Sequence, residues 1–168
     1  MTADAARRVG YLGLGSNVGN SVANLRAAVD ALEAADVRIV ARAAIYVTAP
    51  QGEVLDQPDF MNSALKIETH LEPLDLLDLC KRIERELGRD PEGRRHGPRP
   101  IDIDLLLLGD RAFESDRLTL PHREIATRRF VLQPLLEIEP DLALPDGTRI
   151  DSLADAVADQ PVRRVEPL

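Results

Sequence analysis

Two aspartates stand at alternate positions of an otherwise apolar run, IDIDLLLLG at 101–109. Residues i and i+2 of a β-strand point to the same face, so Asp102 and Asp104 should lie roughly 6.6 Å apart along it. Carboxylates that are close together and partly buried repel each other and lose hydration, so a cation is needed to stabilise them. Mg²⁺ binds one or two carboxylates and completes its shell with water and substrate phosphates. The pair therefore predicts a magnesium site of the kind that assists phosphoryl transfer.

A basic segment, 89–100, comes directly before this run and is also rich in glycine and proline. Arginines beside a metal site suit the phosphates of a nucleoside triphosphate. The glycine and proline content is typical of a loop that closes on a ligand, although any loop can share it. A plainer alternative stays open, because D-x-D is a common string. Both aspartates could pair with Arg95 and Arg99, or face solvent from a one-sided sheet.

Single residues elsewhere give weaker signals. Phe60 and Phe130 are two of only three phenylalanines, and they either belong to the core or grip a flat ligand between them. His122, in LPHRE, could donate to a phosphate or simply be exposed. Glu84 borders the apolar stripe of a predicted helix, where a carboxylate either reaches past the apolar face to water or contacts a ribose or an arginine.

The segment GLGSNVGN at 13–20 resembles a glycine-rich nucleotide loop. It does not fit G-x-G-x-x-G, because Val18 holds the third glycine position, and it lacks the lysine of the P-loop pattern. A tight turn at a sheet edge is the better prediction for this segment.

Hydrophobic periodicity predicts the elements that position these residues. Strands are expected at 9–15, 37–48, 60–69 and 101–109, with a short pair of strands through LTLP at 118–121. One helix begins at Asn20 or Ser21, and a second runs from Pro73 until Gly88 ends it. A third helix at 130–138, a turn at 145–148 and a weak helix complete the chain. The order predicts a ferredoxin-like α+β sandwich, a mainly antiparallel sheet with helices packed on one face.

Composition limits the function classes. The 168 residues predict a single domain, 1–168, with peripheral tails at 1–8 and 159–168. The net charge of −8 argues against a generic nucleic-acid binder. Cys80 is the single cysteine, so no internal disulfide can form, as expected in a reducing compartment. The chain has no signal-peptide pattern and no apolar run near ~18 residues, which predicts a cytoplasmic protein without a membrane span.

Longer strings resemble a known family. GPRPIDIDLLLLG and LTLPHREIATRRFVLQPLLEI, preceded by GLGSNVGN and QPDFMNSAL, are similar to the 6-hydroxymethyl-7,8-dihydropterin pyrophosphokinases of folate biosynthesis. The similarity extends from about Tyr11 to Gly147. The strings G-P-R-x-x-D-x-D and L-P-H-x-x-x-x-x-R-x-F are specific in combination, and the family's ferredoxin-like fold agrees with the predicted element order.

The resemblance implies transfer of pyrophosphate from ATP to the hydroxymethyl group of the pterin, with release of AMP. It implies two Mg²⁺ ions on Asp102 and Asp104, and phosphate-handling roles for Arg89, Arg99 and His122. The implied nucleotide-binding residues are Glu84, Arg95, Arg99, Leu105, Arg117, Thr119, His122, Arg123 and Arg128. The implied pterin-binding residues are Thr48, Pro50, Phe60, Asn62 and Phe130. The partner is a small molecule, and the chain is expected to be a monomer or a weak homodimer.

Four positions depart from the family pattern: His96, Glu92, Arg123 and Lys81. The first two fall in the basic segment, where they affect ring stacking and the grip on the triphosphate. None replaces an aspartate of the pair, so activity is still expected. Two other hypotheses remain. One is a metal-dependent nucleotidyltransferase or phosphohydrolase with another acceptor, and the other is a non-catalytic ferredoxin-like binding module.

Overall fold

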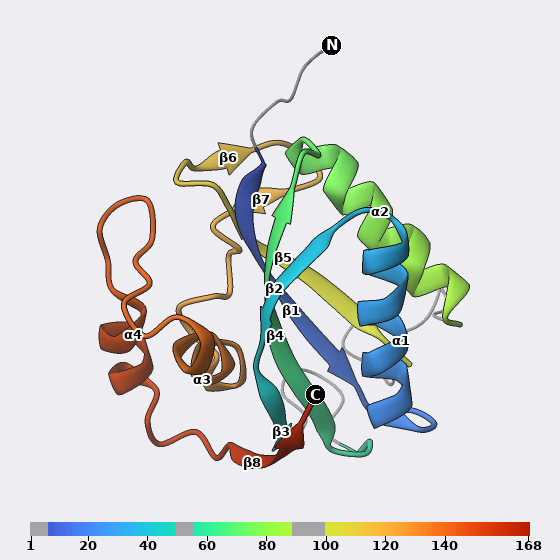
Figure 1. Ribbon diagram of the computed structural model, residues 1–168. Helices are drawn as coiled ribbons and strands as arrows, with labels where there is room; N and C mark the ends of the chain where they lie inside the picture. The colour runs from blue at the N-terminus through green and yellow to red at the C-terminus, as the bar shows by residue number, and fades with distance from the viewer. Residues whose placement is uncertain (1–6, 50–55, 89–99) are drawn as a thin grey trace.

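The computed structural model describes residues 7–49, 56–88 and 100–168, which form an antiparallel sheet with helices on both sides (Figure 1). The elements follow the chain in the order β1 (Arg8–Ser16), α1 (Ser21–Ala34), β2 (Arg38–Arg42), β3 (Ala44–Thr48), β4 (Phe60–Thr69), α2 (Pro73–Glu86), β5 (Asp102–Leu108), β6 (Phe113–Glu114), β7 (Thr119–Leu120), α3 (Arg129–Ile138), α4 (Ile150–Ala156) and β8 (Arg163–Pro167). The predicted α+β class is confirmed.

The main sheet has the order β5-β1-β4-β3-β8, and β2 also pairs with β4. The predicted strand at 37–48 is therefore two strands. They are separated at Ala43, and the register against β4 also shifts within β2, between Ile39 and Ala41. Ala43 lies between β2 and β3, and its N–H still donates to the carbonyl of Ala64 at 2.9 Å. The two strands thus follow the same edge of β4.

Helices α1 and α2 cover one face of the sheet (Figure 1). The side chain of Asn20 accepts from the N–H of Ala23 and caps α1. Asn20 was one of the two residues predicted to begin this helix. Proline occupies the first turn of α2, where its missing N–H costs nothing. The apolar stripes of both helices meet Leu12, Leu65 and Ile103 in the larger of two cores.

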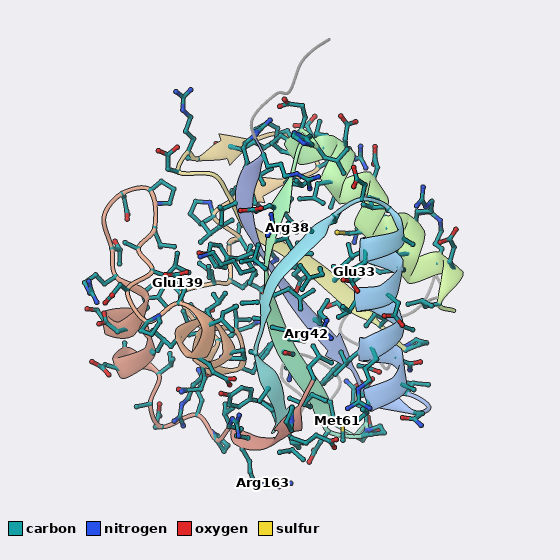
Figure 2. All side chains as sticks on the ribbon, in the orientation of Figure 1. Glu33, Arg38, Arg42, Met61, Glu139 and Arg163 are labelled. Atoms are coloured by element: carbon teal, nitrogen blue, oxygen red, sulfur yellow. The ribbon has the colours of Figure 1, made fainter. Side chains whose placement is uncertain are left out.

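Helix α3 packs against the opposite face and α4 packs on α3, so the expectation of helices on one face is wrong (Figure 1). That face carries Tyr11, Ala64 and Leu106, which α3 must cover to keep them from water. Glu139 follows α3 on this side of the molecule (Figure 2). It accepts from the Tyr11 hydroxyl at 3.3 Å and from Lys66 Nζ at 2.6 Å, which joins the end of α3 to β1 and β4.

The C-terminal segment is an edge strand, whereas the sequence predicted a peripheral tail at 159–168. β8 pairs with β3, and its exposed side chains explain why it lacks an apolar strand pattern. Glu137 of α3 fixes β3 from the helix side, because its carboxylate accepts from the Ala44 N–H at 3.0 Å and from the Tyr46 hydroxyl at 2.6 Å. In the described part of the chain, no helix is both long and apolar enough to cross a membrane.

Candidate active site

The paired aspartates of β5 face the α3 side of the sheet. Their neighbours Ile103 and Leu105 point into the core beneath α1 and α2, so Asp102 and Asp104 point the other way. Across the adjacent strand, Asp102 stands opposite Gly15 and Asp104 opposite Gly13. These two positions of β1 carry no side chains, and both aspartates line the two hollow spaces described below.

Glu84 supports β5 from α2. Its side chain is 2% exposed, and its carboxylate accepts from the N–H of Ile103 at 2.7 Å. β5 is an edge strand of the main sheet, so this N–H would otherwise lack a strand partner. Lys81 lies one helical turn away, with Nζ 3.5 Å from Glu84 Oε1. Glu84 thus holds the residue between the two aspartates.

The electrostatics of the pair disfavour two negative charges. Burial, together with the carboxylates of Asp102 and Glu84, raises the pKa of Asp104 to about 8. Lys81 and Arg128 oppose this rise but do not cancel it. At neutral pH the site therefore favours a proton or a cation beside Asp104.

An apolar pocket lies on one side of the pair; its residues are Gly13, Leu14, Gly15, Thr48, Ala49, Phe60, Asn62, Ser63, Asp102, Asp104, Arg128, Phe130 and Val131. Asn62 is 4% exposed, and its Nδ2 donates to Thr48 Oγ1 at 3.0 Å. Phe130 belongs to the first turn of α3, and the Arg128 guanidinium carbon lies 5.5 Å from the centre of its ring. The pocket combines two aromatic rings with one fixed amide.

A charged cleft lies on the other side of the pair; its residues are Leu77, Lys81, Asp102, Ile103, Asp104, Leu105, Ser115, Asp116, Arg117, Leu118, Thr119, His122, Arg123, Glu124 and Arg128. Its cations already have partners within the protein. Arg117 pairs with Asp78, and Arg128 pairs with Glu124. Arg123 Nε donates to Thr119 Oγ1 at 3.3 Å.

His122 has a defined tautomer in this cleft. Its Nδ1 accepts from the N–H of Glu124 at 3.1 Å, which leaves the proton of a neutral ring on Nε2. Burial lowers the pKa of His122, an effect that Glu124 opposes and Arg128 reinforces. Burial thus favours the neutral ring, which in this geometry donates from Nε2 and can bind a phosphate oxygen.

The structure brings most of the predicted site residues together. Thr48, Phe60, Asn62 and Phe130 meet in the apolar pocket, while Leu105, Arg117, Thr119, His122 and Arg123 meet in the charged cleft. Arg128 and both aspartates line the two spaces at once. Glu84 does not line either space and contacts the backbone of β5 instead. Pro50, Arg89, Glu92, Arg95, His96 and Arg99 lie outside the described residues.

The sequence reasoning missed three contributors. Gly13 and Gly15 lie inside β1, where the predicted strand at 9–15 already placed them, but their part in the site was not predicted. Their alternation with Leu12 and Leu14 was the available signal. Glu124 was also missed, although it precedes Arg128 by four residues, the spacing of an ion pair on one helical face.

The fold is shared with solved HPPK domains. A crystal structure described as HPPK-DHPS in complex with substrates matches 92% of this chain with a TM-score of 0.74 and 14% sequence identity. The match covers 44% of that longer chain, so this protein spans less than half of it. This likeness establishes the fold.

Sequence comparison establishes the family. Residues 11–140 match the family described as 7,8-dihydro-6-hydroxymethylpterin-pyrophosphokinase (HPPK). The 2-amino-4-hydroxy-6-hydroxymethyldihydropteridine pyrophosphokinase of Methylorubrum extorquens is 49% identical over 86% of this chain and 90% of its own length. The enzyme of the same name from Haemophilus influenzae is 41% identical over 94% of this chain and 98% of its own. The chain belongs to the HPPK family, as the sequence motifs predict.

Proposed function

We propose that the chain transfers pyrophosphate from ATP to the hydroxymethyl group of 6-hydroxymethyl-7,8-dihydropterin in folate biosynthesis, and that the reaction depends on Mg²⁺. One observation carries the proposal. An apolar pocket and a charged cleft of different chemistry share Asp102, Asp104 and Arg128. An acceptor bound in the first space and a triphosphate bound in the second would meet at these three residues.

The apolar pocket suits a flat heterocycle. The rings of Phe60 and Phe130 offer two aromatic surfaces, which favour stacking on a planar ligand. Asn62 offers a carbonyl oxygen and an N–H on one side chain, a pattern that complements the alternating donors and acceptors of a pterin edge. We assign pterin binding to these residues and to Thr48.

The charged cleft suits a nucleotide. Arg117, Arg123 and Arg128 supply cationic donors for phosphate oxygens. The Nε2–H of His122 supplies a neutral donor in the same cleft. We assign ATP binding to this cleft, and to Leu105 and Thr119 at its wall.

The two aspartates suit Mg²⁺. Among the described residues, no group of three or more His, Cys, Asp or Glu side chains is placed to hold a metal alone. Mg²⁺ does not need such a group, because water and phosphate oxygens complete its coordination. Asp102 and Asp104 would hold it, and its charge would replace the proton that Asp104 otherwise keeps. When bound, Mg²⁺ neutralises phosphate charge during the transfer.

The proposed step involves one bond formed and one broken. The hydroxyl oxygen of the acceptor attacks the β-phosphorus, and the bond from that phosphorus to the α–β bridging oxygen breaks. AMP leaves with the bridging oxygen, and the hydroxyl proton is released. The protein contributes mainly alignment and charge. The apolar pocket orients the hydroxymethyl arm, while Arg128 and His122 bind phosphate oxygens.

We also propose a cytoplasmic location and a monomeric or weakly dimeric state. Cys80 is buried, and burial raises the pKa of its thiol to about 12, so the thiol is unreactive. A fold whose single cysteine is unreactive does not depend on disulfide formation in an oxidising compartment. Light scattering after gel filtration tests the oligomeric state against the 18.5 kDa mass of one chain.

Incubation with ATP, Mg²⁺ and 6-hydroxymethyl-7,8-dihydropterin tests the reaction. We expect AMP and the pterin diphosphate in equal amounts, separated by liquid chromatography. Reactions without pterin, or with EDTA in excess over Mg²⁺, should yield neither product. Formation of ADP and a pterin monophosphate would show a different kinase. Release of pyrophosphate or phosphate alone would show a hydrolase.

A further inference from the structure

Gly15 occupies a central position between the two halves of the site. β1 lies between β5 and β4, and in its register Gly15 stands opposite Asp102 on one side and Asn62 on the other. Leu12 and Leu14 point into the larger core, so Gly13 and Gly15 share the face toward α3. Asp102, Gly15 and Asn62 therefore lie side by side on three neighbouring strands, and the middle position has no side chain.

The space above Gly15 is already filled by the Asn62 amide. A Cβ at position 15 would lie 3.0 Å from Asn62 Oδ1 and 3.9 Å from Phe60 Cδ1. A Cβ at Gly13 would meet Leu106 Cδ1 at 3.5 Å, which is an ordinary van der Waals distance. The two glycines thus differ, and only at Gly15 must a neighbour move to admit a methyl group.

Asn62 has little freedom to move without losing its geometry. Its Nδ2 donates to Thr48 Oγ1, and its Oδ1, which faces Gly15, has no hydrogen-bond partner among the described residues. A buried acceptor of this kind is costly unless a ligand donates to it. A shift of Oδ1 by a few tenths of an ångström would turn the amide away from the ligand or strain its bond to Thr48.

We propose that Gly15 is a positioning residue for the pterin. Its missing side chain lets the Asn62 amide lie flat over β1, where Oδ1 accepts from an N–H donor on the edge of the heterocycle. This inference rests on the proposed function, because it takes the apolar pocket as the acceptor site. It adds a residue that acts through Asn62 and touches neither the metal nor the phosphates.

A double-mutant cycle on Gly15→Ala and Asn62→Ala tests the proposal. The measurement is the Kd of 6-hydroxymethylpterin by calorimetry, with α,β-methylene ATP and Mg²⁺ present so that no transfer occurs. We expect Gly15→Ala to raise this Kd about tenfold, the fold-change of one lost hydrogen bond. In the Asn62→Ala background the same change should have little further effect. Gly13→Ala is the matched substitution and should cause a smaller loss.

Two further readouts separate positioning from misfolding. Gly15 is not among the glycines with positive φ, so alanine fits its backbone, and the melting temperature should stay close to that of the unmodified protein. The Kd of α,β-methylene ATP alone should also stay unchanged. Equal losses from Gly15→Ala with and without Asn62, or no loss at all, would overturn the inference while leaving the proposed function intact. Normal pterin binding by Asn62→Ala would overturn both the pocket assignment and the inference.

Discussion

The apolar pocket is formed by sheet strands and the first turn of α3, whereas the charged cleft is formed largely by the segment 115–128, with β5 and α2 as its other walls. In the pocket, Asn62 is buried and already bonded to Thr48, so its geometry exists before a ligand arrives. In the cleft, Arg117 and Arg128 are paired with carboxylates of the protein itself. A flat acceptor can enter a site that is ready for it, but a triphosphate must replace internal ion pairs.

This difference should affect the affinity for the acceptor and the affinity for the nucleotide in different ways. Pre-organisation favours affinity in the pocket, because little conformational entropy remains to be lost there. In the cleft, a phosphate replaces a carboxylate that already pairs with an arginine, so the net gain in binding free energy is smaller. Salt should weaken nucleotide binding further. The shared residues, above all Asp102 and Asp104, belong to both spaces and should matter for turnover more than for either affinity.

The largest effect is expected from Asp104→Ala. Turnover should fall by at least roughly 10³-fold, because the charge that aligns metal and phosphate is lost. The protein should remain folded, since the substitution removes a carboxylate that burial already disfavours. Pterin affinity should change little. Kinetics of AMP formation and pterin calorimetry check both statements.

Asp110→Ala is the control for that experiment, because Asp110 is an exposed acid just beyond the end of β5. It should keep normal turnover. Near-normal turnover in Asp104→Ala would remove the two-aspartate metal site from the proposal.

Phe130→Ala should affect only the apolar pocket. Loss of one aromatic wall should raise the pterin Kd roughly thirtyfold, about 2 kcal/mol, while nucleotide affinity stays within about twofold. Phe113→Ala is the matched control, because Phe113 packs against the larger core outside both spaces. It should lower the melting temperature without changing the pterin Kd. Equal losses of pterin and nucleotide affinity in Phe130→Ala would contradict the separation of the two spaces.

Glu124→Gln should affect only the charged cleft, and in the opposite direction. Removing the partner of Arg128 leaves a cation that phosphate can bind without displacing a carboxylate. We expect the Kd of α,β-methylene ATP to fall about threefold, the size of a partly exposed ion pair. The gain should shrink at high salt. A weaker affinity would show that Glu124 holds Arg128 in its binding position and does not compete with the nucleotide.

Local patterns were enough to predict much of this molecule. Strand β4 was predicted at 60–69 and α2 from Pro73, because alternation, proline and glycine act over a few residues. The aspartates of β5 were found because carboxylates in an apolar strand are unusual. The register that places Gly15 between Asp102 and Asn62 joins residues 47 and 87 positions apart in sequence, and no local pattern contains it.

The two missed features of the fold have the same physical origin. β8 is polar because it is an exposed edge, so its sequence carries no apolar alternation although β3 needs its pairing. The side on which α3 packs is decided by which sheet face the other helices leave uncovered. Both depend on the assembled sheet.

The last prediction concerns the pH dependence of the protein's stability without metal. Folding raises the pKa of Asp104 from 3.8 to about 8, so between these values the folded state holds a proton that the unfolded state has lost. Stability should therefore fall as the pH rises through this window. Burial lowers the pKa of His122, so His122 makes stability rise with pH. This rise ends near the ordinary His pKa of 6.5, above which His122 is neutral in both the folded and the unfolded state. From about pH 6.5 to 8, the contribution of Asp104 remains.

Melting curves in EDTA at pH 6.5 and pH 8 measure this contribution. We expect the unmodified protein to lose about 1 kcal/mol, or a few degrees of melting temperature, between the two values. Asp104→Asn keeps the shape of the side chain but cannot ionise, so it should show a flatter profile and greater stability at pH 8. Mg²⁺ with α,β-methylene ATP should stabilise the unmodified protein more at pH 8 than at pH 6.5, because the cation binds the deprotonated pair. A melting temperature that rises with pH in EDTA would mean that the carboxylates are already compensated within the protein, and that the shared centre of the two spaces does not require a cation.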